Sequence, residues 1–145
     1  MQVNIKRLSP DAKIPAYGSA EAAGADLYAL TEGDVVIEKG ETKIIHTGIA
    51  MEIPKGYVGL IYARSGLATK KGLAPANKVG VIDSDYRGEI MVALHNHSDA
   101  AKTVENGERI AQIVLTPYLS ATFSETDSLS DTERGESGFG STGQK

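Results

Sequence analysis

The chain has 145 residues, no cysteine and a formal net charge of −4 at pH 7. A chain of this length is most simply one domain with a single core, and without cysteine it has neither disulfides nor thiolate metal sites. The net charge gives no footprint for DNA or RNA, no apolar run approaches the roughly 20 residues that span a bilayer, and the first residues lack the apolar core of a signal peptide. We therefore expect a cytoplasmic protein that binds neither nucleic acid nor membrane.

Short apolar runs rich in β-branched residues recur along the chain and predict an all-β fold. Breaks that contain Gly or Pro separate the runs, which is typical of a sandwich or barrel. One short helix is expected at residues 65–71, where Ser, Leu, Ala and Lys collect. The expected strands cover residues 35–37, 43–45, 49–53, 57–62, 90–94 and 110–115.

The stretch of residues 80–88 reads Gly-Val-Ile-Asp-Ser-Asp-Tyr-Arg-Gly. Glycines at both ends suit sharp turns. Together with a strand-like exit at residues 89–96, they predict a β-hairpin that presents Asp83. An ionised Asp can orient and deprotonate a water molecule. The same residue can instead be a turn former that hydrogen-bonds to its own backbone, and the residue types do not decide between these alternatives.

Two other stretches carry side chains that are candidates for ligand contacts. Arg64-Ser65-Gly66 offers a guanidinium fork, a hydroxyl and a close backbone approach, although a helix cap beside a surface Arg is the more ordinary interpretation. Arg109 and Gln112 are an odd number of residues apart, so in a strand they point to opposite faces unless a bulge intervenes. The ordinary role for Arg109 is a structural ion pair.

Three further residues are candidates for a metal site. Asp26 comes after a glycine, at the start of a strand-like piece, and it is either a turn former or a residue that organises water around a metal ion. The sequence alone favours the turn. His95 and His97 share one face of their strand but are too few for a zinc site, so we expect them to be surface or supporting residues.

The composition changes near the C-terminus. Residues 120–133 are nearly all Ser, Thr, Asp and Glu, and such a segment cannot bury much surface. Residues 134–145 hold four glycines together with an Arg, a Phe and adjacent hydroxyls. We therefore expect a β-rich core at 1–119, a flexible linker at 120–133 and a glycine-rich segment at 134–145. From the residues alone, a disordered tail and a mobile lid that wraps phosphate are equally good interpretations of this segment.

Taken together, five stretches resemble, in order, the five motifs of the homotrimeric dUTP diphosphatases (dUTPases). The resemblance covers the chain from Ala23 to Thr142. It implies an all-β, jelly-roll-like (β-clip) domain with one short helix, in a homotrimer whose active sites are shared between subunits. The five stretches are Ala23-Gly-Ala-Asp-Leu-Tyr28, Ala63-Arg-Ser-Gly-Leu-Ala68, residues 80–88 with Asn77 before them, Gly107-Glu-Arg-Ile-Ala-Gln112 and the tail Gly138-Phe-Gly-Ser-Thr-Gly143.

The resemblance also implies an activity and a role for individual residues. The family hydrolyses dUTP to dUMP and pyrophosphate with Mg²⁺, which keeps uracil out of DNA and supplies dUMP for dTTP synthesis. Asp83 would activate the attacking water, Tyr86 would lie under the deoxyribose, and Asn77 would hydrogen-bond to uracil. Asp26 would support Mg²⁺ through water, while the substrate phosphates hold most of the ion. The other implied substrate-binding residues are Val81, Ile82 and Met91 at the base, Arg64, Ser65, Gly66 and Gln112 at the phosphates, and Arg134, Phe139, Gly140, Ser141 and Thr142 in the lid.

Two positions depart from the usual family pattern. Ala63 stands where proline is common and Ser137 where glycine is common, and neither change removes a group that the chemistry needs. One alternative function is that of a dCTP deaminase, which shares the fold, but the Ile-Asp-Ser-Asp-Tyr-Arg-Gly string and the tail favour the dUTPase. The other alternative is a non-catalytic β-domain that binds nucleotide or a regulatory partner.

Overall fold

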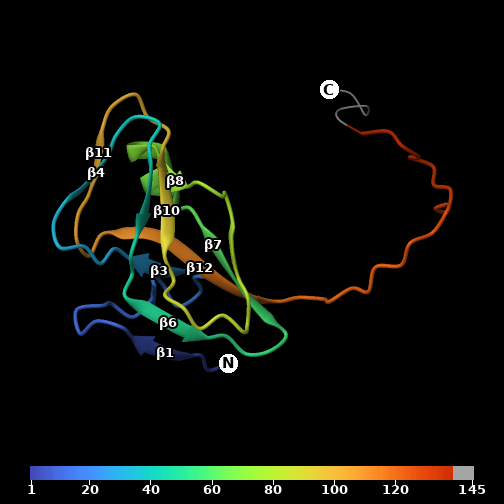
Figure 1. The fold of residues 1–145 in the computed structure, drawn as a ribbon, viewed down its shortest axis with the longest axis horizontal. Helices are drawn as coiled ribbons and strands as arrows, with labels where there is room; N and C mark the ends of the chain where they lie inside the picture. Colours follow the sequence, from blue (N-terminus) through green and yellow to red (C-terminus); the bar gives the residue numbers. More distant parts are fainter. Residues whose placement is uncertain (139–145) are drawn as a thin grey trace.

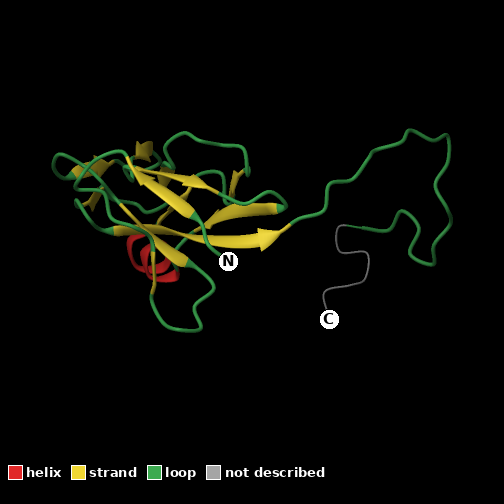
Figure 2. Cartoon of the chain, turned by 90° about the horizontal axis from the view of Figure 1, so that it is seen from below, coloured by secondary structure: helices red, strands yellow, loops and turns green. Residues whose placement is uncertain are grey.

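The computed structural model describes residues 1–138, which form small antiparallel sheets around one core and a long C-terminal extension (Figure 1). The prediction of an all-β fold with one short helix is confirmed. The helix is a single π-type turn, η1 (Leu67–Lys71), on the outer side of the strands (Figure 2). The strands are β1 (Asn4–Arg7), β2 (Ala16–Tyr17), β3 (Ala25–Tyr28), β4 (Val35–Ile37), β5 (Thr42–Ile45), β6 (Ile49–Glu52), β7 (Tyr57–Tyr62), β8 (Leu73–Pro75), β9 (Gly80–Ile82), β10 (Val92–Asn96), β11 (Lys102–Val104) and β12 (Arg109–Pro117).

The largest sheet has five strands in the order β2-β3-β12-β7-β9. Strand β12 is its centre and pairs antiparallel with β3 on one side and with β7 on the other. The register of the β12–β3 pair shifts between Arg109 and Ala111, which is a β-bulge. This sheet carries Asp26, Gln112 and the two strands that lead into Arg64 and Asp83.

A three-stranded sheet, β5-β10-β8, and two two-stranded sheets, β1-β6 and β4-β11, complete the domain. Strand β10 alternates buried and partly exposed residues, as expected where successive side chains point to opposite faces. The buried faces share one apolar core. Its fully buried members include Leu27, Ile37, Ile45, Ile49, Leu73, Ile90, Leu94 and Ile110.

The sequence predicted that the strand entering residues 80–88 pairs with the strand at 89–96 in a hairpin, and this prediction is wrong. Strand β9 pairs with β7, whereas β10 pairs with β5 and β8, so the two strands belong to different sheets. The exit strand also begins at Val92 and not at residue 89. The reason is tertiary: Ile90 donates its N–H to the carbonyl of Ile49, and Val92 and Leu94 are buried in the core from the second sheet.

Beyond β12 the chain leaves the domain as an extended segment of exposed residues (Figures 1 and 2). We call residues 118–138 the arm. Leu119, Phe123 and Leu129 are its large apolar side chains, and all three are almost fully exposed. No helix in the described part of the chain is long and apolar enough to cross a membrane.

Candidate active site

Asp26 lies inside β3 and binds two arginines. Its Oδ1 accepts a hydrogen bond from Nε of Arg64 at 2.7 Å, and its Oδ2 accepts one from Arg109 at 3.1 Å. Asp26 is only 7% exposed, and a buried carboxylate that loses its partners is strongly destabilising. The turn role that the residue types favoured for Asp26 is therefore wrong, while the ion-pair role of Arg109 is confirmed.

The β-bulge in β12 brings Arg109 and Gln112 toward the same partner. Gln112 pairs directly across from Asp26, so the two side chains share one face of the sheet. Arg109 reaches the same carboxylate from the far side of the bulge. Residues an odd number of positions apart normally point to opposite faces of a strand. Here the bulge lets both act at the same carboxylate, which is the exception that the sequence analysis allowed.

Gln112 is held in place by two neighbours. Its Nε2 donates a hydrogen bond to the carbonyl of Ala63 at 2.9 Å. A Cβ atom on Gly24 would overlap the Gln112 carboxamide, so only glycine leaves room for this side chain. Gln112, Asp26 and Arg64 therefore form one group at the junction of β3, β12 and the end of β7.

Ser65 and Gly66 begin the turn after β7. The N-cap residue of η1 is Gly66, and no side chain caps the helix. The helix-cap interpretation of Ser65 is therefore wrong. Both residues are exposed, so the Ser65 hydroxyl and the Gly66 backbone are open to a ligand beside Arg64.

The loop after β9 forms a hollow of about 280 Å³. It is lined by Val81, Ile82, Asp83, Tyr86, Glu89 and Met91. The Tyr86 hydroxyl donates to the carbonyl of Glu89 at 2.9 Å, and a Cβ atom on Gly88 would overlap the Tyr86 ring. The tyrosine ring is thus held against Gly88 at the edge of the hollow.

Asp83 presents an exposed carboxylate at this hollow. The turn-former alternative requires its side chain to accept hydrogen bonds from nearby backbone amides, and within residues 1–138 it makes none. The turn is closed instead by backbone and arginine contacts: Tyr86 N–H donates to the Asp83 carbonyl at 3.2 Å, and Arg87 donates to the carbonyl of Ser84 at 2.7 Å. The Asp83 carboxylate is therefore free to bind water.

Asn77 lies in the turn that leads into β9. The carbonyl of Asn77 accepts a hydrogen bond from Val79 at 2.7 Å, and Lys78 between them has a φ of 65°. The side-chain Nδ2 of Asn77 lies 3.5 Å from the position that a Cβ on Gly80 would occupy. Asn77 is exposed, so its amide is accessible at the start of β9.

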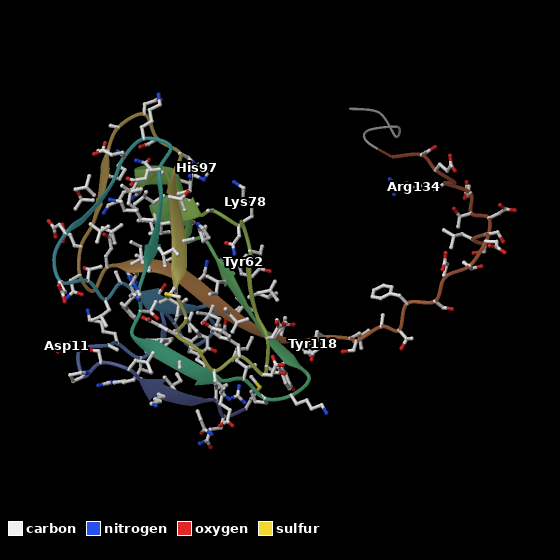
Figure 3. All side chains as sticks on the ribbon, in the orientation of Figure 1. Asp11, Tyr62, Lys78, His97, Tyr118 and Arg134 are labelled. Atoms are coloured by element: carbon white, nitrogen blue, oxygen red, sulfur yellow. The ribbon has the colours of Figure 1, made fainter. Side chains whose placement is uncertain are left out.

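One chain does not bring all of these residues together. Ile82 pairs with Gly59 on β7, whose last residue is Tyr62, and Arg64 follows two residues later. At about 3.3 Å per residue along a strand, Asp83 and Arg64 are separated by roughly 15–20 Å. Tyr62 and Tyr118 mark the two ends of β7 in Figure 3, because Tyr118 bonds to Gly56 just before that strand.

Comparison with known proteins decides the family. A family model described as dUTPase matches residues 10–143. The chain belongs to the dUTPase family. Its relatives include proteins named deoxyuridine 5′-triphosphate nucleotidohydrolase from Nautilia profundicola, 53% identical over 99% of this chain and all of the relative, and from Hydrogenobaculum sp., 48% identical over the full length of both.

The fold of this dUTPase chain matches solved structures from the same family. A Staphylococcus bacteriophage 80alpha dUTPase with dUPNHPP gives a TM-score of 0.90 at 31% identity, with 98% of each chain covered. A mutant of that phage enzyme with dUpNHpp gives a TM-score of 0.89 at 30% identity and the same coverage.

One candidate lid residue of the dUTPase chain, Arg134, lies on the arm and away from the domain (Figure 3). Arg134 is exposed on the arm, and its Nε donates to the carbonyl of Ser137 at 2.9 Å (Figure 3). Phe139, Gly140, Ser141 and Thr142 lie outside the described residues.

The histidine pair lies on the surface beside β10. The rings of His95 and His97 meet edge to face with centroids 4.4 Å apart, and Nδ1 of His95 is 2.8 Å from the Thr42 hydroxyl. Loss of hydration, together with His95 and Lys78, lowers the pKa of His97. No group of three or more potential metal ligands gathers among residues 1–138.

Glu89 also lines the hollow, and the sequence analysis did not select it. Its carboxylate binds His46 Nδ1 at 2.9 Å and accepts hydrogen bonds from the amides of Gly48 at 2.8 Å and Thr47 at 3.2 Å. Burial alone would raise the pKa of Glu89, but the bond from His46 and the two amides outweigh it and lower the pKa below its ordinary value. The partners lie more than 40 residues away in the sequence, so no local pattern pointed to this residue.

Proposed function

We propose that this chain hydrolyses dUTP to dUMP and pyrophosphate, which removes dUTP as a source of uracil in DNA and supplies dUMP for dTTP synthesis. Full-length relatives named deoxyuridine 5′-triphosphate nucleotidohydrolase and a phage dUTPase of the same fold with dUPNHPP support this substrate. The observation that carries the proposal is the hollow beside β9, where an aromatic ring and an unengaged carboxylate face one small space.

In this proposal Asp83 is the catalytic base. An ordinary aspartate is ionised at neutral pH, and the exposed carboxylate can orient a water molecule and accept its proton. The water oxygen forms a bond to the α-phosphorus, and the bond from that phosphorus to the pyrophosphate leaving group breaks. Asp85 has no such role in this proposal, because it does not line the hollow; it lines only the neighbouring surface groove, which Asp83 also borders.

The nucleoside would bind along β9 and the loop that follows. The backbone and side chains of Val81, Ile82 and Met91 would contact the uracil, and the Asn77 amide would hydrogen-bond to it. Tyr86 would contact the deoxyribose, where a ribose 2′-hydroxyl would clash with its ring. The six residues that line the hollow support this assignment, since they combine apolar side chains with the Asp83 carboxylate and the Tyr86 ring.

The triphosphate would bind at the junction of β3, β12 and β7. Asp26 engages Nε of Arg64, which leaves the two terminal nitrogens of the guanidinium for bidentate contacts with phosphate oxygens. Ser65 would add its hydroxyl, Gly66 its backbone N–H and Gln112 its amide. Asp26 thus acts on the phosphates through the arginine that it orients.

The active chain would be a homotrimer. Asp83 and Arg64 lie at opposite ends of β7 in one chain, so a site that uses both requires a second copy. The arm carries exposed apolar residues at Leu119, Phe123 and Leu129, which supports docking on another subunit. In that assembly Arg134 would clamp the γ-phosphate, Phe139 would stack on uracil, and Gly140, Ser141 and Thr142 would close on the phosphates.

Magnesium would enter with the substrate. Mg²⁺ retains several waters and binds phosphate oxygens more readily than an all-protein cage, which fits a described chain without a three-ligand cluster. Both oxygens of Asp26 accept hydrogen bonds from arginine, so this carboxylate would reach the ion only through water. When bound, Mg²⁺ would stabilise the charge that develops on the leaving pyrophosphate.

The test is a substrate panel with the purified full chain and Mg²⁺. We expect pyrophosphate release from dUTP at a much higher kcat/KM than from dTTP, dCTP or UTP. Ammonia release should be assayed in parallel with dCTP. Release of ammonia from dCTP without formation of dUMP from dUTP would establish the dCTP deaminase function instead. Binding of dUTP without any turnover would establish the non-catalytic alternative.

A further inference from the structure

The segment that follows the Tyr86 loop is clamped to the turn between β5 and β6. The carboxylate of Glu89 binds His46 and the amides of Thr47 and Gly48. Next to it, the Thr47 hydroxyl donates to the carbonyl of Ile90, whose own N–H donates to Ile49 at 2.9 Å. Thr47 and Ile90 are almost fully buried. These bonds fix the backbone of residues 89 and 90 to the core.

Tyr86 depends on that fixed backbone. Its hydroxyl donates to the Glu89 carbonyl, and its ring covers Gly88. Other contacts of the loop are internal or weak: Arg87 donates to carbonyls within the loop, and its ion pair with Glu52 is 3.7 Å long between exposed side chains. The position of the tyrosine ring is therefore set mainly from its C-terminal side, through residue 89.

The clamp is stronger with a charged carboxylate than with a neutral amide. The Glu89 side chain is 21% exposed and receives donors on both oxygens. Bonds from donors to an ionised acceptor are roughly twice as strong as neutral ones. A glutamine at this position has almost the same volume and keeps one acceptor oxygen. Its NH₂ group would replace the other oxygen and face a donor instead of accepting from it, so the clamp would loosen.

We infer that Glu89 is a positioning residue that holds the Tyr86 ring against the sugar of the substrate and thereby sets the discrimination between deoxyribo- and ribonucleotides. This inference rests on the proposed function. Glu89 acts through its backbone carbonyl and the core contacts of its side chain, without being the base or a phosphate ligand. A loosened clamp lets the ring move away from the 2′ position, so a ribonucleotide is no longer excluded.

The test compares Glu89→Gln with Glu41→Gln in the full chain. Glu41 is a matched control, because its carboxylate also accepts a backbone amide bond and pairs with a cation, Lys43, but it lies away from the hollow. We expect Glu89→Gln to lower the ratio of kcat/KM for dUTP to that for UTP at least about fivefold, the size of one lost hydrogen bond. The ratio of Glu41→Gln should stay within about twofold of the wild type.

A double-mutant cycle with Tyr86→Phe shows whether Glu89 acts through the tyrosine. Tyr86→Phe keeps the ring but removes the hydroxyl bond to residue 89, so Glu89→Gln should change the ratio much less in that background. If Glu89→Gln does not fold, His46→Gln, which removes one partner of the carboxylate from the surface, should give a smaller loss in the same direction.

The outcomes separate this inference from the proposed function. A wild type that prefers dUTP, with Glu89→Gln and Glu41→Gln giving the same ratio, would overturn the inference alone. A wild type that hydrolyses neither nucleotide would overturn the proposed function. In that case the ratio of the dissociation constant for UMP to that for dUMP still tests Glu89, since the same change should reduce it.

Discussion

Nε of Arg64, just after β7, donates to Oδ1 of Asp26 in β3 at 2.7 Å, and the two residues are 38 positions apart in the sequence. The bond engages Nε of the guanidinium and leaves its two terminal nitrogens without a bond to Asp26. Arg109 occupies the second oxygen of the same carboxylate. A single buried acidic residue thus holds two arginines in place.

Replacing Arg109 with alanine should destabilise the domain. The change leaves the buried Asp26 with one cation, but Arg109 is half exposed, so we expect a loss of about 1–2 kcal/mol in the free energy of unfolding. Urea unfolding measures it. Lys39→Ala is the control, because it breaks an exposed pair with Asp99 that should contribute less than about 1 kcal/mol. Equal effects of the two changes would contradict a structural role for the Asp26 pair.

Replacing Asp83 with asparagine should abolish turnover without abolishing binding. Loss of a general base lowers kcat by about 10²–10⁴-fold, while the dissociation constant for dUTP should change little because the side chain keeps its size. Steady-state kinetics and calorimetry measure the two quantities. Asp85→Asn, two residues along the same loop, should stay within a few-fold of the wild type. Nearly full hydrolysis by Asp83→Asn would rule out this residue as the base.

Gly48→Ala should destabilise the fold more than Gly40→Ala. Both glycines have a left-handed φ, 68° and 73° respectively, and alanine in that conformation costs about 1–2 kcal/mol. At Gly48 the added Cβ would also overlap Leu30 and approach Ala12, whereas at Gly40 it meets nothing within 4 Å. Overpacking should add about 1–3 kcal/mol at Gly48. Urea unfolding would show the difference as a lower midpoint concentration for Gly48→Ala, provided that the dependence of the unfolding free energy on urea is the same for both variants. Equal losses of unfolding free energy would refute the packing argument.

The stability of the domain should depend on pH through Glu89. Its pKa is lower in the folded chain than its ordinary value of 4.5, so the folded state favours the ionised form. The stabilisation is fully present above pH about 4.5 and is lost as the pH falls through the lower folded pKa. The difference in unfolding free energy between the wild type and Glu89→Gln should therefore shrink below pH about 4.5. A difference in unfolding free energy that stays constant down to pH 3 would contradict a stabilising role for the ionised Glu89.

Deleting residues 134–145 should leave a folded assembly with reduced turnover. The deletion removes the proposed clamp of Arg134 on the γ-phosphate, so we expect a loss of at least about tenfold in kcat/KM for dUTP, the size of a charge-assisted contact. The melting temperature and the number of chains in the assembly should not change, because the deleted segment follows an exposed arm. Unchanged turnover would show that the segment takes no part in the reaction.

The sequence by itself determined the family, the β-class and the position of the helix. The family follows because five motifs occur in order along the chain, and the β-class follows because short β-branched runs and frequent Gly or Pro breaks are local properties of the sequence. Strand β7 was predicted at its observed bounds, and the core of β12 was predicted correctly at residues 110–115. The short edge strands β1, β2, β8 and β11 were missed, since each has only two to four residues.

Only the tertiary structure decided how the candidate site is built. The separation of β9 and β10 into two sheets, the bulge beside Arg109, the two arginines on Asp26 and the clamp on Glu89 all depend on partners about 20 to 80 residues away. Such partners leave no periodic pattern in the sequence, because the chain pays the entropy of closing a long loop once and then pairs wherever burial and hydrogen bonding are best satisfied. Local residue types fixed which groups are present, and packing fixed which of them meet.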